Sequence, residues 1–185
     1  IEKACPIRLP RAAQAGRGFR HRNVTVRELH AFIDDRPVGV VSEEGDSWAF
    51  AYDPAWAGDP EGFDLSPALR RSAVRIFDGA SERPVQWYFD NLLPEQALRT
   101  LYAREAGLAG EDAFGLLAFY GAESAGSLVL LPPGQGPVAA AGRRPLSDAD
   151  LSARIRNLPR VPLMRDAPKR MSVAGAQHKL LVVAG

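Results

Sequence analysis

The chain has 185 residues, of which 46% are hydrophobic and 24% charged, so it can bury the core of one medium-sized domain or of two small ones. No apolar run approaches the roughly 20 residues that a membrane-spanning helix needs, which argues against a membrane protein. The single cysteine, Cys5, excludes an internal disulfide framework, and the three histidines are too scattered to predict a metal site. This composition fits a reduced, cytoplasmic setting.

The net charge of +1 hides a basic N-terminal arm. Residues 1–27 carry seven Lys and Arg side chains against Glu2 alone, whereas the rest of the chain is acidic. We interpret residues 1–25 as a solvated, disordered arm. The alternative is a nucleic-acid-binding module that uses this arm to contact phosphates, with binding that weakens steeply as salt is added.

Alternating apolar residues predict an antiparallel β-meander that begins near Val26. Residues 29–33 alternate with a period of two, and residues 48–52 place three aromatic side chains on one face of a later strand. Residues 53–62 are expected to form a loop. Residues 64–69 are predicted to form a short edge strand, because Pro67 has no N–H to donate to a ladder.

The middle of the chain is predicted to be helical. Apolar residues at i, i+3, i+4 and i+7 indicate a helix over residues 85–92, in which Asp90 is expected to act as a helix-end cap rather than as a general acid. Pro94 suits the first turn of a second helix, which Gly107 or Gly110 should end. A third helix is expected over residues 112–120.

A buried strand over residues 127–131 is followed by a linker rich in Pro, Gly and Ala over residues 132–145. The next helix has a capping signature, in which Ser147 caps and Asp150 lies near the positive helix end. Its apolar face is expected to comprise Leu151, Ile155 and Leu158.

The C-terminal residues 171–183 predict a strand, a turn of small residues and a second strand. The turn contains Ala174, Gly175 and Ala176, which would let backbone N–H groups approach a phosphate closely, with Lys179 available to neutralise it. An ordinary hairpin with a small-residue loop explains the same spacing, because short glycine motifs are weak evidence.

Three ordered blocks resemble the HipA family of bacterial serine/threonine kinases, the toxin members of HipA–HipB toxin–antitoxin pairs. Residues 87–95 read WYFDNLLPE and are similar to the family's F-x-x-F/Y-x-N-L-L-P-type signature. Residues 112–128 resemble its next block, and residues 171–179 (MSVAGAQHK) resemble its S-x-x-G-A-Q-x-K nucleotide loop. The resemblance covers about residues 26–183.

This resemblance implies roles for the matching positions only. It implies that the ATP phosphates are bound by Ala174, Gly175, Ala176, Gln177, His178 and Lys179. Ser172 would be the serine that family members autophosphorylate, which expels the loop and stops activity. His178 stands where some relatives carry an acidic residue, so no role is implied for its side chain.

The resemblance also implies the fold and the domain organisation. The expected fold class is α+β, with an antiparallel β-rich N-lobe segment and packed helices that end in the glycine-rich strand–turn–strand of a divergent protein-kinase-like fold. Residues 26–131 would form the N-terminal β/α subdomain, which also helps to contact the antitoxin. Residues 146–185 would begin the kinase core, with its capped helix and nucleotide loop.

Phosphoryl transfer also needs an orienting Asp and metal-binding Asn and Asp residues, which in this family come from a large helical C-lobe. We therefore expect no catalytic or metal-binding residue in this chain, and no transfer activity from the chain alone. ATP and Mg²⁺ would serve the intact kinase, with neither bound tightly by this chain by itself. A separate, non-catalytic N-lobe subunit that regulates a kinase toxin is the other alternative.

The expected partners follow from the same resemblance. They are a HipB-like DNA-binding antitoxin, DNA reached indirectly through it, and a protein substrate for which family precedent suggests a tRNA synthetase. No membrane contact is expected.

Overall fold

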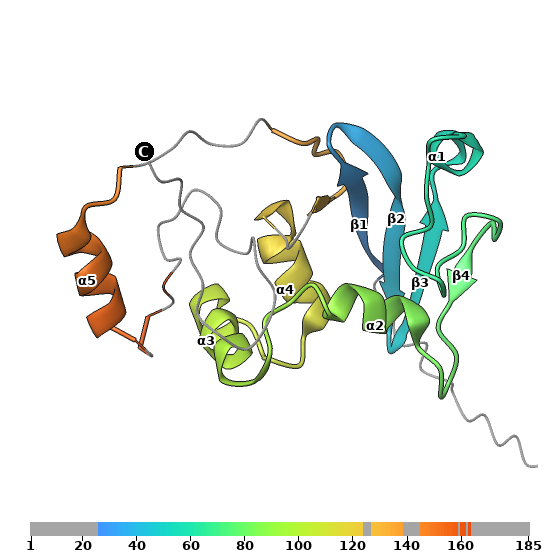
Figure 1. The fold of residues 1–185 in the computed structure, drawn as a ribbon. Coiled ribbons are helices and arrows are strands. Elements are labelled where there is room, and N and C mark those ends of the chain that lie inside the picture. Colours follow the sequence, from blue (N-terminus) through green and yellow to red (C-terminus); the bar gives the residue numbers. More distant parts are fainter. Residues whose placement is uncertain (1–25, 124–126, 139–144, 159, 162, 164–185) are drawn as a thin grey trace, which may run out of the picture.

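The computed structural model describes residues 26–123, 127–138, 145–158, 160, 161 and 163. Its elements form an α+β fold in which helices lie beside one antiparallel sheet (Figure 1). The strands are β1 (Val26–Ile33), β2 (Arg36–Glu44), β3 (Ser47–Tyr52), β4 (Ile76–Phe77) and β5 (Leu128–Leu131). The helices are α1 (Pro54–Gly58), α2 (Pro84–Asp90), α3 (Gln96–Ala106), α4 (Ala113–Tyr120) and α5 (Asp148–Arg156), with a 3₁₀ turn at Gly121–Glu123.

The predicted meander is confirmed. The five strands lie in the order β4-β3-β2-β1-β5, and every neighbouring pair is antiparallel. Leu29 pairs with Val41, which in turn pairs with Phe50, so these three buried side chains line the same face of the sheet. The period of two in the sequence therefore marks the core-facing side of the sheet.

Helices α2 and α4 pack on this apolar face through aromatic contacts. Trp48 of β3 meets Phe114 of α4 edge-to-face, with ring centroids 5.0 Å apart. Phe50 meets Phe89 of α2 at 5.5 Å. Such pairs add to the stabilisation from burial alone. The three predicted helices of residues 85–120 are confirmed as α2, α3 and α4. Pro94 does not lie in the first turn of α3 as predicted, because this helix begins at Gln96 with Glu95 as its N-cap.

Local capping residues set the ends of α3 and α4. Gly107 follows α3 in the left-handed conformation, with φ of 68°, which glycine adopts without steric cost. Asp112 precedes α4, and its carboxylate accepts a 2.9 Å hydrogen bond from the N–H of Gly115. The predicted stop at Gly107 and the start near residue 112 are both observed.

Strand β5 returns to the sheet beside β1, where Ala31 pairs with Leu130. The turn before β5 passes so close to this strand that a Cβ on Gly121 would lie 2.6 Å from the Cβ of Leu130. Glycine is therefore required there for the backbone to reach the sheet.

Two expectations for residues 53–69 are wrong. The predicted loop contains helix α1, whose start is marked by Asp53, which caps the N–H of Ala55 at 2.8 Å, and by Pro54 in the first turn. The predicted edge strand over residues 64–69 is a turn closed by an isolated bridge between Ser66 and Leu69. Proline at the second position of a tight turn is as favourable as proline in an edge strand, and residues 64–69 adopt the turn. The edge strand beside β3 is β4.

The cap of α5 is confirmed, because Ser147 Oγ accepts a 3.1 Å hydrogen bond from the N–H of Asp150. Its predicted apolar face is not buried in the described structure. Ile155 is 53% exposed, and no residue of α5 is buried. The linker over residues 132–145 is only partly described, and the arm over residues 1–25 lies outside the described residues.

Candidate functional site

The residues that the sequence assigns to nucleotide binding lie outside the described part of the chain. They are Ser172, Ala174, Gly175, Ala176, Gln177, His178 and Lys179. Their roles stay predictions. The basic arm, on which the nucleic-acid alternative depends, is also outside the described residues. The described residues instead show how the N-terminal motifs are held and which surfaces they expose.

The signature at residues 87–95 comprises the end of α2 and the connection from α2 to α3. An ion pair between Asp90 and Arg99 joins the two helices. Asp90 lies in the last turn of α2, where a carboxylate meets the negative end of the helix. The Nη1 atom of Arg99 lies 2.8 Å from Oδ1 of Asp90, which compensates for this unfavourable position. The prediction that Asp90 caps a helix end is therefore wrong, since Asn91 occupies the C-cap position and Asp90 pairs across to α3.

Arg99 also contacts the connection between α3 and α4. Its Nε donates a 2.7 Å hydrogen bond to the carbonyl oxygen of Gly110. Leu93, in the middle of the signature, is 1% exposed and belongs to the core. In the described structure, the signature thus carries a packing role, which its polar Asp and Asn residues do not reveal in the sequence.

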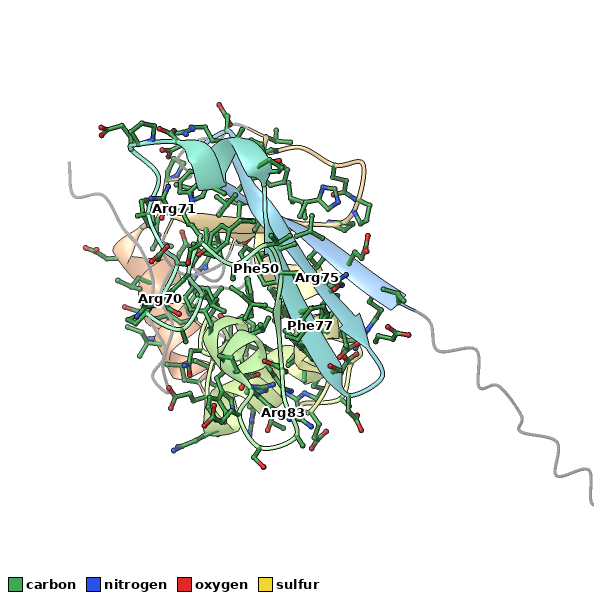
Figure 2. All side chains as sticks on the ribbon, turned by 90° about the vertical axis from the view of Figure 1, so that its right-hand side faces the viewer. Phe50, Arg70, Arg71, Arg75, Phe77 and Arg83 are labelled. Atoms are coloured by element: carbon green, nitrogen blue, oxygen red, sulfur yellow. The ribbon has the colours of Figure 1, made fainter. Side chains whose placement is uncertain are left out.

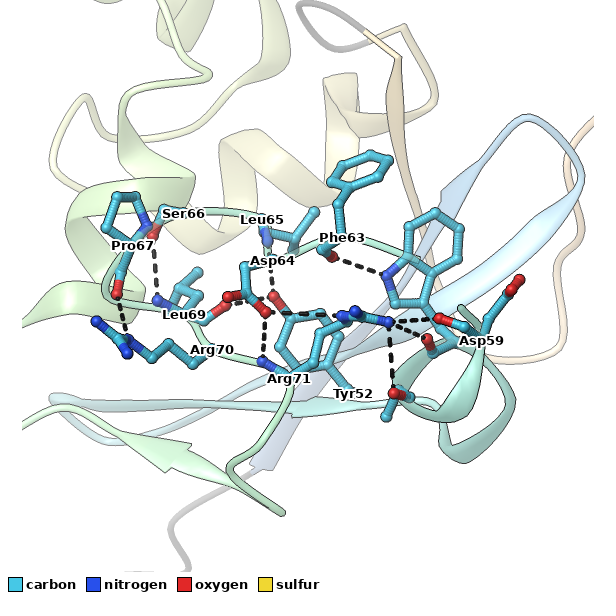
Figure 3. Close-up of polar contacts among 12 residues, drawn as sticks. Tyr52, Asp59, Phe63, Asp64, Leu65, Ser66, Pro67, Leu69, Arg70 and Arg71 are labelled. Atoms are coloured by element: carbon cyan, nitrogen blue, oxygen red, sulfur yellow. Dashed lines mark hydrogen bonds and ion pairs between the residues drawn. The ribbon is translucent and has the colours of Figure 1, made fainter. Parts of the chain in front are cut away.

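A polar cluster holds residues 56–71 against β3 (Figure 3). The hydroxyl of Tyr52 donates to the carbonyl oxygen of Leu69 and accepts a 2.7 Å hydrogen bond from the N–H of Leu65. Burial raises the pKa of this hydroxyl above its ordinary value. The Tyr52 hydroxyl remains protonated at neutral pH and so satisfies two backbone groups that would otherwise be unpaired.

Arg71 also belongs to this polar cluster, which it joins to the end of α1 (Figure 3). Its Nη1 donates to the carbonyl oxygens of Asp59 at 2.8 Å and Trp56 at 3.2 Å, at the C-terminal end of α1. A cation is stabilising at that end of a helix. The backbone N–H of Arg71 is bound 2.8 Å from Oδ1 of Asp64, so both ends of the residue are fixed. Sequence reasoning missed Arg71, because no local pattern separates it from the adjacent Arg70.

The start of α2 is bound to the end of β4 through one carboxylate. Asp78 accepts hydrogen bonds from the N–H groups of Val85 at 2.8 Å and Gln86 at 3.0 Å. Burial raises the pKa of Asp78, and these two donors oppose that rise. This contact fixes the edge strand to the helical layer.

Around β4 the surface is basic and partly apolar (Figure 2). The figure shows Arg75 next to Phe77, with Arg83 below them and Arg70 further to the left, on the same side as Arg71. Phe77 is 60% exposed, and the Arg75 guanidinium lies 4.9 Å from the centroid of its ring. The sequence did not predict this combination of an exposed ring and a guanidinium beside it.

Within the described ranges, no group of three or more His, Cys, Asp or Glu side chains could hold a metal ion. None of the helices described has both the length and the apolar composition needed to cross a membrane.

Residues 29–131 match the family model of the HipA N-terminal domain. The chain belongs to this family. The matched range begins within β1 and ends with β5, so it corresponds to the five-stranded sheet and its helical layer.

Two curated proteins share similarity with this HipA-family chain over most of its length. It is 34% identical over 168 residues to a putative kinase, Y4mE, of Sinorhizobium fredii, covering 86% of this chain and 39% of the relative. It is 28% identical over 156 residues to the serine/threonine-protein kinase toxin HipA of Shewanella oneidensis, covering 83% of this chain and 34% of the relative. The chain therefore spans between a third and two fifths of these relatives.

A solved structure shares the fold. It is the Shewanella oneidensis complex of HipA, HipB and operator DNA, with a TM-score of 0.57 and 24% sequence identity, covering 70% of this chain and 29% of the matched chain. At this level of identity the match supports the α+β fold of the HipA N-terminal region.

Proposed function

We propose that this chain supplies the N-terminal region of a HipA-like serine/threonine protein kinase toxin. The observation that carries the proposal is the extent of the kinase similarity. The similarity to the Sinorhizobium relative covers 86% of the chain, which is more than the matched residues 29–131 can account for. The similarity to this relative therefore extends beyond residues 29–131.

In this proposal residues 174–179 form the ATP phosphate-binding loop. Ala174, Gly175 and Ala176 would offer backbone N–H groups at close range, since no bulky side chain intervenes. Lys179 would supply a positive charge that stabilises the transferring phosphoryl group, while bound ATP and Mg²⁺ would provide the phosphoryl donor and its counter-ion. Ser172, at the edge of the loop, would be the autophosphorylation site.

The described domain has a supporting role in the proposal. Its sheet and helices would position the kinase core and present a surface to a HipB-like antitoxin. The Shewanella relative is found with HipB and operator DNA, which supports an antitoxin partner and an indirect contact with DNA. The protein substrate would be recognised by the intact kinase.

The test is phosphoryl transfer by the full-length protein. Lys179→Ala should lower the transfer of phosphate from ATP to protein by about two orders of magnitude, comparable to removing one charge-stabilising donor. Thermal unfolding should change little, because a loop lysine contributes no core packing. Lys169→Ala is the matched control, since it removes the same charge ten residues earlier in the sequence. Equal activity of the Lys179→Ala and Lys169→Ala proteins would reject the assignment of the loop.

A further inference from the structure

Among the described residues, the main-chain N–H and C=O of Phe77 in β4 have no hydrogen-bond partner. The N–H of Asp78 donates a 2.8 Å hydrogen bond to the carbonyl oxygen of Trp48 in β3. Phe77 is paired with Ala49, one residue further along the ladder. Hydrogen-bonded and non-hydrogen-bonded pairs alternate in an antiparallel ladder, so the N–H and C=O of Phe77 point away from β3.

Two side chains at this edge, those of Arg75 and Phe77, lie on the face of the sheet opposite the helices. Phe77 shares the side of its partner Ala49, whereas Ile76 packs against the core. Arg75 extends over the same outer side, where its Nη2 donates a 3.0 Å hydrogen bond to Ser42 Oγ and its guanidinium lies over the Phe77 ring. The edge therefore presents an exposed aromatic ring with a cation held beside it.

Three arginines in the segments before and after β4 donate hydrogen bonds to neutral acceptors, although the charge of Arg83 also acts on the carboxylate of Asp78. Arg70 donates to the carbonyl oxygen of Pro67, Arg75 to the Ser42 hydroxyl, and Arg83 to the carbonyl oxygen of Asp46 and the side-chain oxygen of Gln86. All of these acceptors are neutral. Within the described part of the chain no carboxylate lies at ion-pair distance from these three arginines, whereas Arg27, Arg36, Arg71 and Arg99 each have at least one.

We propose that this edge binds an extended, acidic peptide segment of a partner protein by β-strand addition. The incoming strand would pair with the outward N–H and C=O of Phe77, and its alternate acidic side chains would meet Arg70, Arg75 and Arg83. Strand addition obtains its affinity from main-chain hydrogen bonds and its specificity from alternate side chains. An open edge strand is available for such pairing because its polar groups are not satisfied within the sheet.

The observations favour a peptide over a nucleic acid. The open edge offers both a donor and an acceptor, whereas a phosphate group only accepts hydrogen bonds. This proposal goes beyond the kinase assignment and does not depend on it.

The experiment measures the binding of a fluorescent peptide of alternating glutamate and valine to the 185-residue chain by anisotropy. We expect saturable binding that weakens about two- to fivefold for each of Arg70→Gln, Arg75→Gln and Arg83→Gln, the range expected for exposed charge pairs. Arg156→Gln on α5 is the control, because it removes an exposed charge from a helix distant from β4 (Figure 1). A peptide methylated on alternate backbone nitrogens should bind much more weakly, because its strand edge cannot donate.

Hydrogen exchange separates strand addition from simple charge attraction. With peptide bound, the amide of Phe77 should exchange more slowly, while the amide of Asp78, already bonded to Trp48, should change little. Absence of saturable binding would overturn the proposal, as would an unprotected Phe77 amide or an equal effect of Arg156→Gln. Displacement of the peptide by a DNA duplex at lower concentration would instead identify the surface as a nucleic-acid site.

Discussion

Arg27 of β1 donates a 2.9 Å hydrogen bond from Nη2 to Oδ1 of Asp112, the residue that caps α4. Eighty-five residues separate the two, so this contact joins the first strand to the helical layer. The same guanidinium pairs with Glu43 of β2 and lies 5.0 Å from the centroid of the Phe114 ring. One arginine thus connects two strands and a helix at the border of the core.

Asp112 has two separable roles, and two substitutions should distinguish them. Asp112→Asn keeps a good helix cap but loses the ion pair with Arg27, so the free energy of unfolding should fall by up to about 1 kcal/mol. Asp112→Ala loses both, and the fall should reach about 1–2 kcal/mol. Urea denaturation of the two variants measures the difference. Equal destabilisation would mean that the cap contributes nothing.

The stability should also depend on pH through Asp112. The hydrogen bond from Arg27 holds the pKa of this carboxyl below its usual range. A lowered folded-state pKa contributes stability above the unfolded pKa, and that stability is lost as the pH falls through the folded pKa. Between about pH 5 and pH 2, the wild-type chain should therefore lose more stability than Asp112→Asn. Parallel curves for the two proteins would contradict this role.

Arg71 should be the most sensitive of the exposed-loop arginines. Arg71→Ala removes the charged donor from the carbonyl oxygens of Trp56 and Asp59, which then keep only the backbone N–H groups of Asp59 and Gly62, so we expect a loss of about 1–2 kcal/mol in the free energy of unfolding. Arg70→Ala is the neighbouring control, because its one hydrogen bond, to Pro67, is exposed, and it should cost less than about 0.5 kcal/mol. A comparable loss from both substitutions would show that the cluster in Figure 3 is not the source of stability.

Gly39 allows β2 and β3 to approach each other closely. A Cβ at this position would lie 2.3 Å from the carbonyl oxygen of Ala51 and 2.7 Å from Cζ of Phe50. Gly39→Ala should therefore destabilise the protein by about 1–3 kcal/mol through overpacking. Gly58→Ala is the control, because an added Cβ there has no neighbour within 4 Å. A thermal melt that is unchanged for Gly39→Ala would contradict the close packing.

The predicted nucleotide loop is tested by Ser172 in the full-length protein. Phosphorylation adds about −1.5 to −2 charge, which would compete with ATP phosphates at the same loop. Ser172→Asp should therefore weaken ATP binding, whereas Ser172→Ala should keep the binding and abolish autophosphorylation. Isothermal titration with ATP compares the two variants. Equal ATP affinities would identify residues 171–183 as a plain hairpin.

Features that depend on residues close together along the chain could be predicted from the sequence. The period of two in residues 29–33 and the aromatic alternation in residues 48–52 identified the core face of the sheet, because side chains alternate along any strand. Ser147 and Gly107 marked helix ends, since caps are satisfied within one turn of the chain. The signature at residues 87–95 indicated the family from the sequence alone.

The tertiary structure decided which distant segments meet. No local pattern pairs β5 with β1, Arg27 with Asp112, or Arg71 with the carbonyl groups at the end of α1, because these contacts join residues that only the folded chain brings together. The same reason explains the misplaced edge strand. Residues 64–69 have the composition of an edge, but the position beside β3 is taken by β4, whose two residues are too few to show any period. The charges of Arg70, Arg75 and Arg83 are visible in the sequence, whereas their gathering around an open strand is a property of the fold alone.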